Sequence, residues 1–341
     1  MKKIATVDAV GHILCHDITR IVKDVVKDTP FRKGHIVREE DIELLLSLGK
    51  EHLYIWEKKE GMLHENEAAE ILYDICKNDN MSGSEIREGK IELKADIDGL
   101  FRVDIERLEK INDLDEIVIA TRHTNYAVKK GNKLAGMRVI PLIIEEEKLK
   151  EAQKIGGDRP LLELLPYIKR TAAVVTTGSE VYHKRIKDTF TPVIINKLKN
   201  YHIEVVHHKI VDDDREMIVN AIKECKEKGV DMIICTGGMS VDPDDLTPSS
   251  IRKSGANIVT YGAPVLPGAM FLLGYFDDET PIMGLPGCVM YSKATIFDLI
   301  LPRVAAGVKV TKKDIARMGH GGLCFSCEVC TYPRCEFGKG V

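Results

Sequence analysis

The chain has 341 residues, of which 44% are hydrophobic and 30% are charged, and its formal net charge is −4. This length exceeds the usual size of one compact domain, so we expect two or three folding units, and the composition excludes a fibrous or disordered chain. The sequence contains no dense stripe of Lys and Arg, which argues against nucleic acid as a partner.

The first residues do not resemble a targeting segment. The sequence MKKIATVDAVGHILCHDIT starts with basic residues but has no apolar run before His12, Cys15 and Asp17, so it does not read as a signal peptide. No stretch of the sequence approaches the apolar length that a membrane-spanning helix needs. We therefore expect a cytoplasmic protein without a membrane partner.

Residues 1–60 are predicted to form a small α+β module. Short apolar runs alternate there with turns around Gly11, Pro30 and Gly34. A helical pattern from Glu39 to Leu48 ends at Gly49, which is a common stop signal for a helix.

Residues 61–165 are predicted to form a mixed α/β region. A helical pattern over Glu65–Lys77 is followed by short strand-like runs such as IVIATR and GMRVIPLII. The charged run EEEKLKEAQK predicts a solvated connecting helix that leads to Gly156 and Gly157. We find no chemical motif in this region.

Residues 166–310 alternate strand and helix patterns: AAVVTTG, TPVIINKLKNY, IEVVHHKIV, REMIVNAIKECKEKG and DMIICTGG. This alternation predicts an α/β fold, with a parallel or mixed sheet and helices on both faces. Ligands of such sheets bind at the carboxyl ends of the strands, so the loops after the strands are where we expect chemistry.

Two of these loops are rich in glycine and hydroxyl groups. Thr177-Gly178-Ser179-Glu180 follows the predicted strand 172–176, and Thr236-Gly237-Gly238-Met239-Ser240 follows the strand 231–235. Glycine lets backbone N–H groups approach an anion, and the hydroxyls add donors. A single turn of this kind is also what an ordinary tight connection contains. Two of them on successive parallel strands favour a phosphate site.

Further glycine turns follow later in the chain. They are Pro267-Gly268 and the segment Gly284-Leu285-Pro286-Gly287-Cys288, which opens a predicted helix over VMYSKATIFDLILPRV. The N–H groups at the start of a helix attract anions, so Gly287 could contribute to the same site.

Acidic residues gather in the same loops: Asp188, Asp212, Asp213, Asp214, Asp242, Asp244 and Asp245. Carboxylates beside a phosphate site suggest Mg²⁺, which binds a few carboxylates together with substrate oxygens. Helix capping explains some of them equally well. Asp213 or Asp214 could cap the helix that begins near Arg215, and Thr247-Pro248 is typical of a cap followed by proline in the first turn.

The last region, residues 311–341, is a cysteine-rich tail. Cys324, Cys327, Cys330 and Cys335 have the spacing C-x2-C-x2-C-x4-C, and in a reducing cytosol such clustering points to metal. Zinc and an iron–sulfur cluster both remain open. The spacing approaches the bacterial ferredoxin pattern, with one residue more before the fourth cysteine. Both a structural metal and a redox switch fit this pattern, whereas Cys235 lies in an apolar strand and is expected in the core.

Residues 168–305 resemble the molybdopterin-binding domain shared by MogA-type adenylyltransferases and MoeA-type molybdenum-insertion enzymes. The first 60 residues resemble the N-terminal extension of MoeA-type chains. The resemblance rests on the sequence segments GHIL…DIT and KGHIVREEDI…LG. The segments that carry the main resemblance, in chain order, are Thr177-Gly178-Ser179-Glu180, Asp213 in VDDDREM, Thr236-Gly237-Gly238-Met239-Ser240 with Asp245, Pro267-Gly268 and Gly284-Leu285-Pro286-Gly287.

The resemblance implies a site for the pterin dithiolene and its phosphate, built from the glycine turns. Asp213 and Asp245 would handle Mg²⁺ and the chemistry, which in MoeA-type enzymes hydrolyses adenylylated molybdopterin and places molybdate on the dithiolene sulfurs. A molybdoenzyme apoprotein is an expected partner, and the chain is expected to form a homo-oligomer. The implied ligand-binding residues are Thr177, Gly178, Ser179, Glu180, Asp188, Thr236, Gly237, Gly238, Ser240, Pro267, Gly268, Pro286 and Gly287.

The sequence departs from this family at three places. Ala269 stands where a lysine is usual, Cys288 and Val289 stand where asparagine and proline are usual, and the cysteine tail takes the place of a closing β-rich domain. These departures keep open a second hypothesis, a carrier or sensor that holds molybdopterin without converting it. A nucleotide-processing enzyme is a third hypothesis, because a fold alone does not fix a function.

Overall fold

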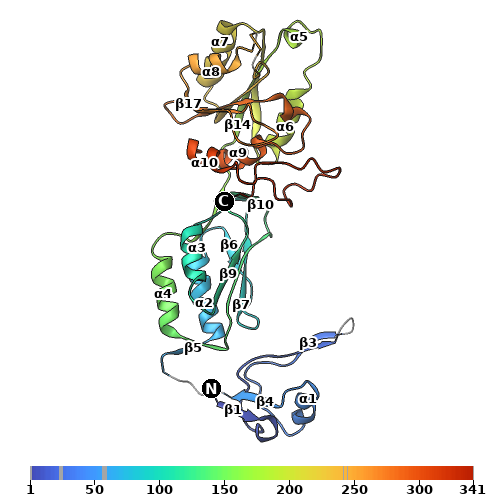
Figure 1. Cartoon of the computed structure of the whole chain (residues 1–341), viewed down its shortest axis with the longest axis vertical. Coiled ribbons are helices and arrows are strands. Elements are labelled where there is room, and N and C mark those ends of the chain that lie inside the picture. Colours follow the sequence, from blue (N-terminus) through green and yellow to red (C-terminus); the bar gives the residue numbers. More distant parts are fainter. Residues whose placement is uncertain (1, 23–25, 56–59, 241, 244, 341) are drawn as a thin grey trace. The chain divides into compact units, whose positions relative to one another are not determined.

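The computed structural model describes residues 2–22, 26–55, 60–240, 242–243 and 245–340 (Figure 1). The chain divides into two compact units, each of which is described by itself. The first contains Met1–Ile97, Arg102–Thr124 and Lys130–Leu164, and the second contains Asp98–Phe101, Asn125–Lys129 and Leu165–Val341. Both contain helices and strands, which confirms the predicted α/β class.

The first unit begins with a small α+β part. Its elements are β1 (Lys2–Ala5), β2 (Ile18–Val22), β3 (Val26–Phe31), α1 (Asp41–Ser47) and β4 (His52–Ile55). Antiparallel pairs join β1 to β4 and β2 to β3. Leu14, Phe31 and Leu45 are buried in its own small core, so the helix predicted near Glu39–Leu48 packs against the strands.

The rest of this unit is a four-stranded antiparallel sheet with the order β6–β7–β11–β9 and three helices. The elements are β5 (Met62–His64), α2 (Glu65–Cys76), β6 (Met81–Gly83), β7 (Lys90–Ala95), α3 (Ile105–Asn112), β9 (Ile117–Thr121), β11 (Lys133–Val139), β12 (Ile143–Glu145) and α4 (Glu146–Gly156). The charged run predicted as a solvated connection is α4, but this helix buries Leu149, Ala152 and Gly156. Their helical spacing gives α4 an apolar face that packs on α2 and α3. A separate three-stranded sheet has the order β10–β8–β13, with β8 (Gly99–Val103), β10 (Tyr126–Val128) and β13 (Leu162–Pro166). β10 and residues 99–101 of β8 belong to the second unit.

The second unit is built on a six-stranded mixed sheet with the order β15–β14–β16–β19–β18–β17. The strands are β14 (Thr171–Thr177), β15 (Glu204–Val211), β16 (Met232–Thr236), β17 (Asn257–Tyr261), β18 (Leu272–Tyr275) and β19 (Pro281–Leu285). The first four strands in this order are parallel to one another, and β18 pairs antiparallel with both of its neighbours, β19 and β17. All residues of β16 and β19 are buried, which explains their continuous apolar runs.

Helices cover both faces of this sheet, as predicted. Because successive side chains of a strand point to opposite faces, Ala172 and Val174 enter one core while Ala173 and Val175 enter the other. Cys235 is fully buried in the second core, which confirms that it is a core residue. The helices of the first face are α6 (Phe190–Lys199), α9 (Ile296–Ala305) and α10 (Lys312–Arg317), and those of the second are α7 (Arg215–Glu227) and α8 (Thr247–Lys253).

Two predicted helix starts are wrong. The single helix predicted after Gly287 is a short 3₁₀ turn, η2 (Gly287–Met290), followed by the separate helix α9. The side chains of Thr295 and Asp298 form a capping box, which starts α9 afresh at Ile296. Thr247 is the first residue of α8 and not its cap, which is Leu246.

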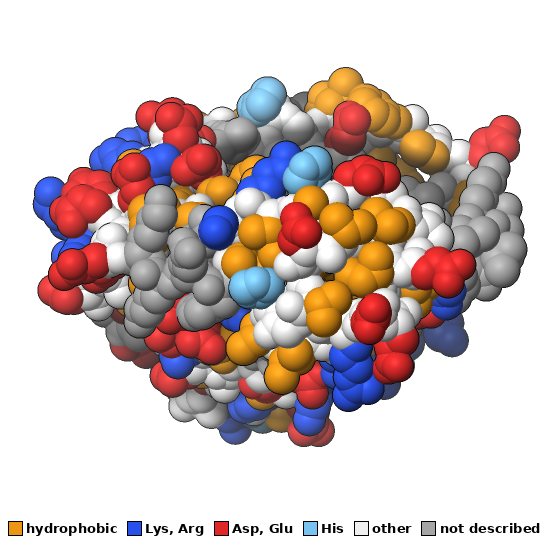
Figure 2. All heavy atoms as spheres, turned by 90° about the horizontal axis from the view of Figure 1, so that it is seen from below, with side chains coloured by type: hydrophobic (Ala, Val, Ile, Leu, Met, Phe, Trp, Pro, Cys, Tyr) orange, Lys and Arg blue, Asp and Glu red, His pale blue; other side chains and the backbone are white. Residues whose placement is uncertain are grey.

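The surface carries mixed charge. On the face drawn in Figure 2, the described Lys and Arg side chains are interspersed with Asp and Glu and form no continuous basic stripe. Among the described residues, none of the helices combines the length and the apolar character needed to traverse a lipid bilayer.

Candidate functional site

The candidate site lies along the carboxyl edge of the parallel strands. Thr177 at the end of β14 pairs with Val211 at the end of β15, and Thr236 at the end of β16 pairs with Leu285 at the end of β19. The four loops that follow these strands therefore start from one edge of the sheet, as the sequence predicted. They begin at Gly178, Asp212, Gly237 and Pro286.

The first two glycine turns pack directly on each other. Gly237 and Gly238 both have positive φ angles, of +86° and +53°. A Cβ at Gly237 would lie 2.1 Å from the carbonyl oxygen of Thr177, and one at Gly238 would lie 2.9 Å from Oγ1 of Thr247. The hydroxyls of Thr177 and Thr247 are 3.1 Å apart and both residues are buried. Glycine is thus required here for close approach as well as for its backbone conformation.

The loop after β15 is hydrogen-bonded to the first glycine turn. The backbone N–H of Ser179, the first residue of α5 (Ser179–Tyr182), donates to Oδ2 of Asp213 at 2.8 Å. The Ser179 hydroxyl donates to Asp212, which also lies 3.2 Å from Nε2 of His183. The bond from Ser179, with smaller contributions from Asp213 and His183, lowers the pKa of Asp212. The N–H of Ser179, which the sequence analysis expected to bind phosphate, therefore already donates to Asp213.

Capping of α7 is performed by Asp214. Its Oδ1 accepts from the backbone N–H of Met217 at 2.8 Å, in the first turn of the helix. This confirms that one of the two neighbouring aspartates is a cap. Asp213 instead contacts Ser179.

Asp188 is held within the protein. Its carboxylate accepts from the N–H groups of Phe190 and Thr191 at 2.9 and 3.0 Å and from the Thr191 hydroxyl at 2.6 Å. Burial alone would raise the pKa of Asp188, but these hydrogen bonds and the nearby His208 bring it below its ordinary value. The side chain is only 12% exposed, so its contacts are those of a residue that fixes the start of α6.

A network of hydroxyl groups lies beneath the turns, and the sequence analysis missed it. Oγ1 of Thr176 lies 3.1 Å from Oγ1 of Thr191 and 3.0 Å from Nε2 of His208, and it accepts from Thr236 at 3.3 Å. The three threonines are buried, and burial lowers the pKa of His208. The sequence signal for this network was a threonine at the carboxyl end of each of two apolar strands, Thr176 in β14 and Thr236 in β16.

Asp245 lies in the loop that follows the second glycine turn. Its Oδ2 accepts from the N–H of Asp242 at 3.1 Å, and its own N–H donates to the carbonyl of Asp242 at 3.0 Å. Tyr261, at the end of β17, donates to the carbonyls of Met239 and Ser240 at 3.2 and 3.3 Å. Burial and the charge of Asp245 raise the pKa of Tyr261. Asp244 lies outside the described residues.

The two later glycine turns lie at different places. A Cβ at Gly268 would lie 2.5 Å from Cγ2 of Ile296, and the Ile296 N–H donates to the carbonyl of Pro267, so this turn packs on the start of α9. Gly287 is exposed at the start of η2, with no atom within 4 Å of where its Cβ would be. Val289, where the resemblance expects proline, is fully buried.

Positive charge gathers beside the first turn in a loop that the sequence analysis did not single out. Lys184, Arg185 and Lys187 are exposed, and the N–H of Arg185 donates to the carbonyl of Glu180 at 2.8 Å. We call residues 183–187 the basic loop. Lys and Arg bind phosphate oxygens, so a loop of this charge can attract an anion that approaches the first turn.

Metal binding by the acidic residues needs additional ligands. In the described parts of the chain, no three or more His, Cys, Asp or Glu side chains are grouped so that they could hold a metal ion by themselves. One carboxylate oxygen of Asp213 accepts a hydrogen bond from the N–H of Ser179, and one of Asp245 accepts from the N–H of Asp242. Each carboxylate also has a second oxygen that can bind a cation. These residues fit Mg²⁺ only together with substrate oxygens, which is a common arrangement for this ion.

A family model described as "Probable molybdopterin binding domain" matches residues 173–306, and a second one, described as a domain of unknown function, matches residues 3–57. Residues 173–306 therefore form a domain of this molybdopterin-binding family, which confirms the predicted resemblance for that part of the chain. The match contains the loops after β14, β15, β16 and β19, from which the candidate site is built.

Similar proteins match the chain over limited lengths. A "Putative competence-damage inducible protein" of Bacillus cereus is 32% identical over 95 residues, which is 28% of this chain and 23% of that protein. A "Putative molybdopterin biosynthesis protein" of Methanocaldococcus jannaschii is 32% identical over 106 residues, which is 31% of this chain and 26% of that protein. The chain thus spans about a quarter of the length of these relatives.

Among solved structures, a molybdopterin biosynthesis MoeA protein from Pyrococcus horikoshii is similar with a TM-score of 0.33 and 13% identity, over 90% of this chain and 74% of that one.

Proposed function

We propose that the domain over residues 173–306 binds molybdopterin along the carboxyl edge of its sheet, and that the chain inserts molybdate into adenylylated molybdopterin. The observation that carries this proposal is the contact between the first two glycine turns at Thr177. It joins two donor-rich turns into one continuous surface beside Asp213 and Asp245.

The binding step is assigned to the turns and the basic loop. The phosphate of the pterin would lie against the turns that contain Gly178, Gly237 and Gly238. Lys184 and Arg185 would approach from the exposed basic loop, where positive charge attracts the dianionic phosphate. Because Oδ2 of Asp213 already accepts from the Ser179 N–H, this residue would position the first turn, and its other carboxylate oxygen would bind substrate or metal.

The chemical step is assigned to the acidic residues. Asp213 and Asp245 would hold Mg²⁺ together with phosphate oxygens, and the bound ion would act as a Lewis acid during hydrolysis of the adenylyl phosphate. Oδ2 of the half-buried Asp245 accepts from the Asp242 N–H, and this hydrogen bond would orient the carboxylate before substrate arrives. Molybdate and the dithiolene are substrates of this reaction, and a molybdoenzyme apoprotein would receive the product.

An insertion assay tests this proposal. Purified protein, Mg²⁺, molybdate and adenylylated molybdopterin are combined, and product is measured by reactivation of a cofactor-free molybdoenzyme. We expect multiple turnovers, a loss of about 100-fold or more in Asp245→Ala, and no change in Glu227→Ala, an exposed carboxylate of α7. Unchanged turnover in Asp245→Ala would contradict the assignment.

A carrier or sensor of molybdopterin is the second candidate. Ala269 and Cys288 favour it, because neither supplies the usual cation or amide of the insertion enzymes. In the same assay a carrier retains pterin without forming product in excess of the protein. The cytoplasmic location of the protein and its assembly into a homo-oligomer remain predictions.

A further inference from the structure

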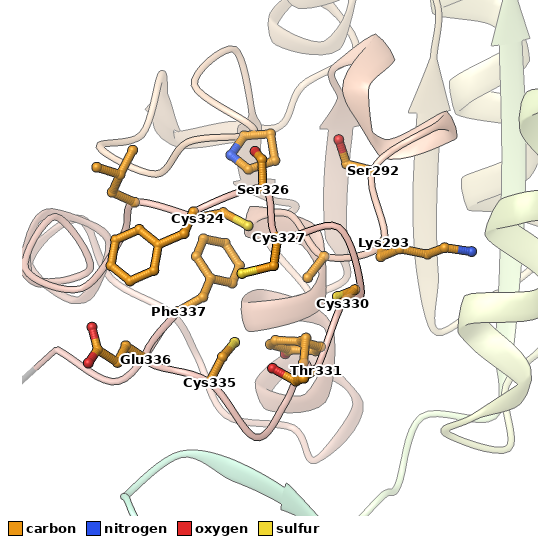
Figure 3. Close-up of a pocket in the computed structure, with 15 residues that line it drawn as sticks. Ser292, Lys293, Cys324, Ser326, Cys327, Cys330, Thr331, Cys335, Glu336 and Phe337 are labelled. Carbon is orange, nitrogen blue, oxygen red and sulfur yellow. The ribbon is translucent and has the colours of Figure 1, made fainter.

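The four cysteines of the tail lie within 12 residues of the chain, and all four line one cavity. Figure 3 shows Cys324, Cys327, Cys330 and Cys335 around this hollow, whose volume is about 230 Å³. All four thiols are free, and Cys327 and Cys330 are exposed. The fold has therefore gathered four soft ligands at one place without joining any two in a disulfide.

The tail is fastened to the domain on both sides of this cavity. On the N-terminal side, Leu323 forms a parallel bridge with Leu266, and the N–H of Cys324 donates to the Leu266 carbonyl at 2.8 Å. On the C-terminal side, Phe337 is only 4% exposed and packs in the core of the sheet's first face. Between them, the Tyr332 hydroxyl donates to the carbonyl of Asp298 at 3.2 Å. These anchors hold the cysteine loop in place before a ligand binds.

The cavity suits a thiolate-bound group of low polarity. Its other walls include Leu323, Phe325, Tyr332 and Phe337, and the charged residues among its lining are Lys293 and Glu336. A hydrophobic shell of this kind limits water around bound metal. The thiolates themselves are the ligands that zinc and iron–sulfur clusters prefer.

Four thiolates at one cavity can hold either a zinc ion or an iron–sulfur cluster. The spacing of the cysteines favours the cluster. The run C-x2-C-x2-C supplies three cluster ligands in bacterial ferredoxins, where the fourth cysteine of the run binds a second cluster. In this chain Cys335 lines the same cavity as the other three cysteines, so it is placed to supply the fourth ligand of one cluster.

We propose that Cys324, Cys327, Cys330 and Cys335 bind a [4Fe–4S] cluster. Each thiol loses its proton as its bond to iron forms. The site lies beyond the family match at 173–306 and does not rest on the proposed function. Pro267, Ser292 and Lys293 border the same cavity, so the cluster would lie beside Pro267 and the segment that precedes α9.

The test is reconstitution of the full chain under anaerobic conditions with ferrous and ferric iron and sulfide, which together supply the mixed-valence cluster. We expect about four iron and four acid-labile sulfide per chain, a broad absorbance near 400 nm and a paramagnetic signal after reduction with dithionite. Cys327→Ser and Cys330→Ser should each lose most of the bound iron and sulfide. Both positions are exposed, so the variants should keep the far-UV circular dichroism of the wild type.

Cys288→Ser is the matched control, because Cys288 lies outside the cavity and should not affect cluster content. The proposal would be overturned if the wild type bound one zinc ion per chain in competition with iron and without labile sulfide. It would also be overturned if the wild type bound no metal, or if both tail variants kept the full iron and sulfide content. Molybdopterin binding can be measured on the same samples, so failure of the cluster proposal is distinguishable from failure of the proposed function.

Discussion

Gly237→Ala is the substitution that most sharply tests the contact between the two glycine turns. The new Cβ would lie 2.1 Å from the carbonyl oxygen of Thr177, where ordinary contact begins at 3.4 Å. Thr177 has little freedom to retreat, because it pairs with Val211 in β15 and its neighbour Thr176 pairs with Thr236 in β16. The substitution should therefore separate the turns or distort the end of β14.

Two effects add to the cost of this substitution. The φ angle of +86° is unfavourable for alanine by about 1–2 kcal/mol, and the forced steric overlap adds about 1–3 kcal/mol. Gly229→Ala is the matched control, since Gly229 has a φ of +70° but nothing within 4 Å of its Cβ. The control should therefore lose only the backbone part, about 1–2 kcal/mol.

Thermal unfolding followed by circular dichroism measures this difference. At roughly 3 °C per kcal/mol for a unit of this size, we expect Tm to fall by roughly 6–15 °C in Gly237→Ala and by roughly 3–6 °C in Gly229→Ala. Equal losses in the two variants would refute the reasoning, because the contact with Thr177 would then contribute nothing.

Two further predictions concern Asp188 and the tail. Because the folded-state pKa of Asp188 is below its ordinary value, its stabilisation is present above about pH 4 and is lost as pH falls through the folded-state pKa. In Asp188→Asn, Tm measured between about pH 3 and 7 should fall less steeply on the acid side than in the wild type, and an unchanged slope would contradict this. Phe337→Ala should lower the free energy of unfolding by about 3–5 kcal/mol, since this side chain is only 4% exposed. Phe325→Ala, at a side chain that is 68% exposed, should change it by about 0.5 kcal/mol or less, so equal losses would show that the tail is not anchored through Phe337.

The fold of the second unit could be predicted because its physical signals are local. Strands buried on both faces appear in the sequence as continuous apolar runs. In the helices between them, apolar residues recur every three or four positions. The order of the strands could not be predicted, because β14 lies between β15 and β16 through pairings that are not local in the sequence. The break between η2 and α9 was missed because the capping box of Thr295 and Asp298 lies within a stretch that otherwise favours helix.

The candidate site could be proposed from the sequence as a set of residues, but the contacts among them could not. Glycines after several strands pointed to one edge of the sheet, because the carboxyl ends of parallel strands meet at the same edge. The sequence could not show that Asp213 accepts from Ser179, since 34 positions separate the two residues. The same holds for the tail, where spacing grouped the four cysteines but only the fold shows that they share one cavity.

Binding of molybdopterin to the pair Gly237→Ala and Gly229→Ala tests the central claim most directly. The intrinsic fluorescence of the pterin can be titrated with each folded variant at a temperature well below both unfolding midpoints. We predict saturable binding for the wild type and Gly229→Ala, and a loss of affinity of about 10-fold or more for Gly237→Ala, equivalent to about 1.4 kcal/mol. Equal affinity in all three proteins would contradict the assignment of the ligand to this edge of the sheet.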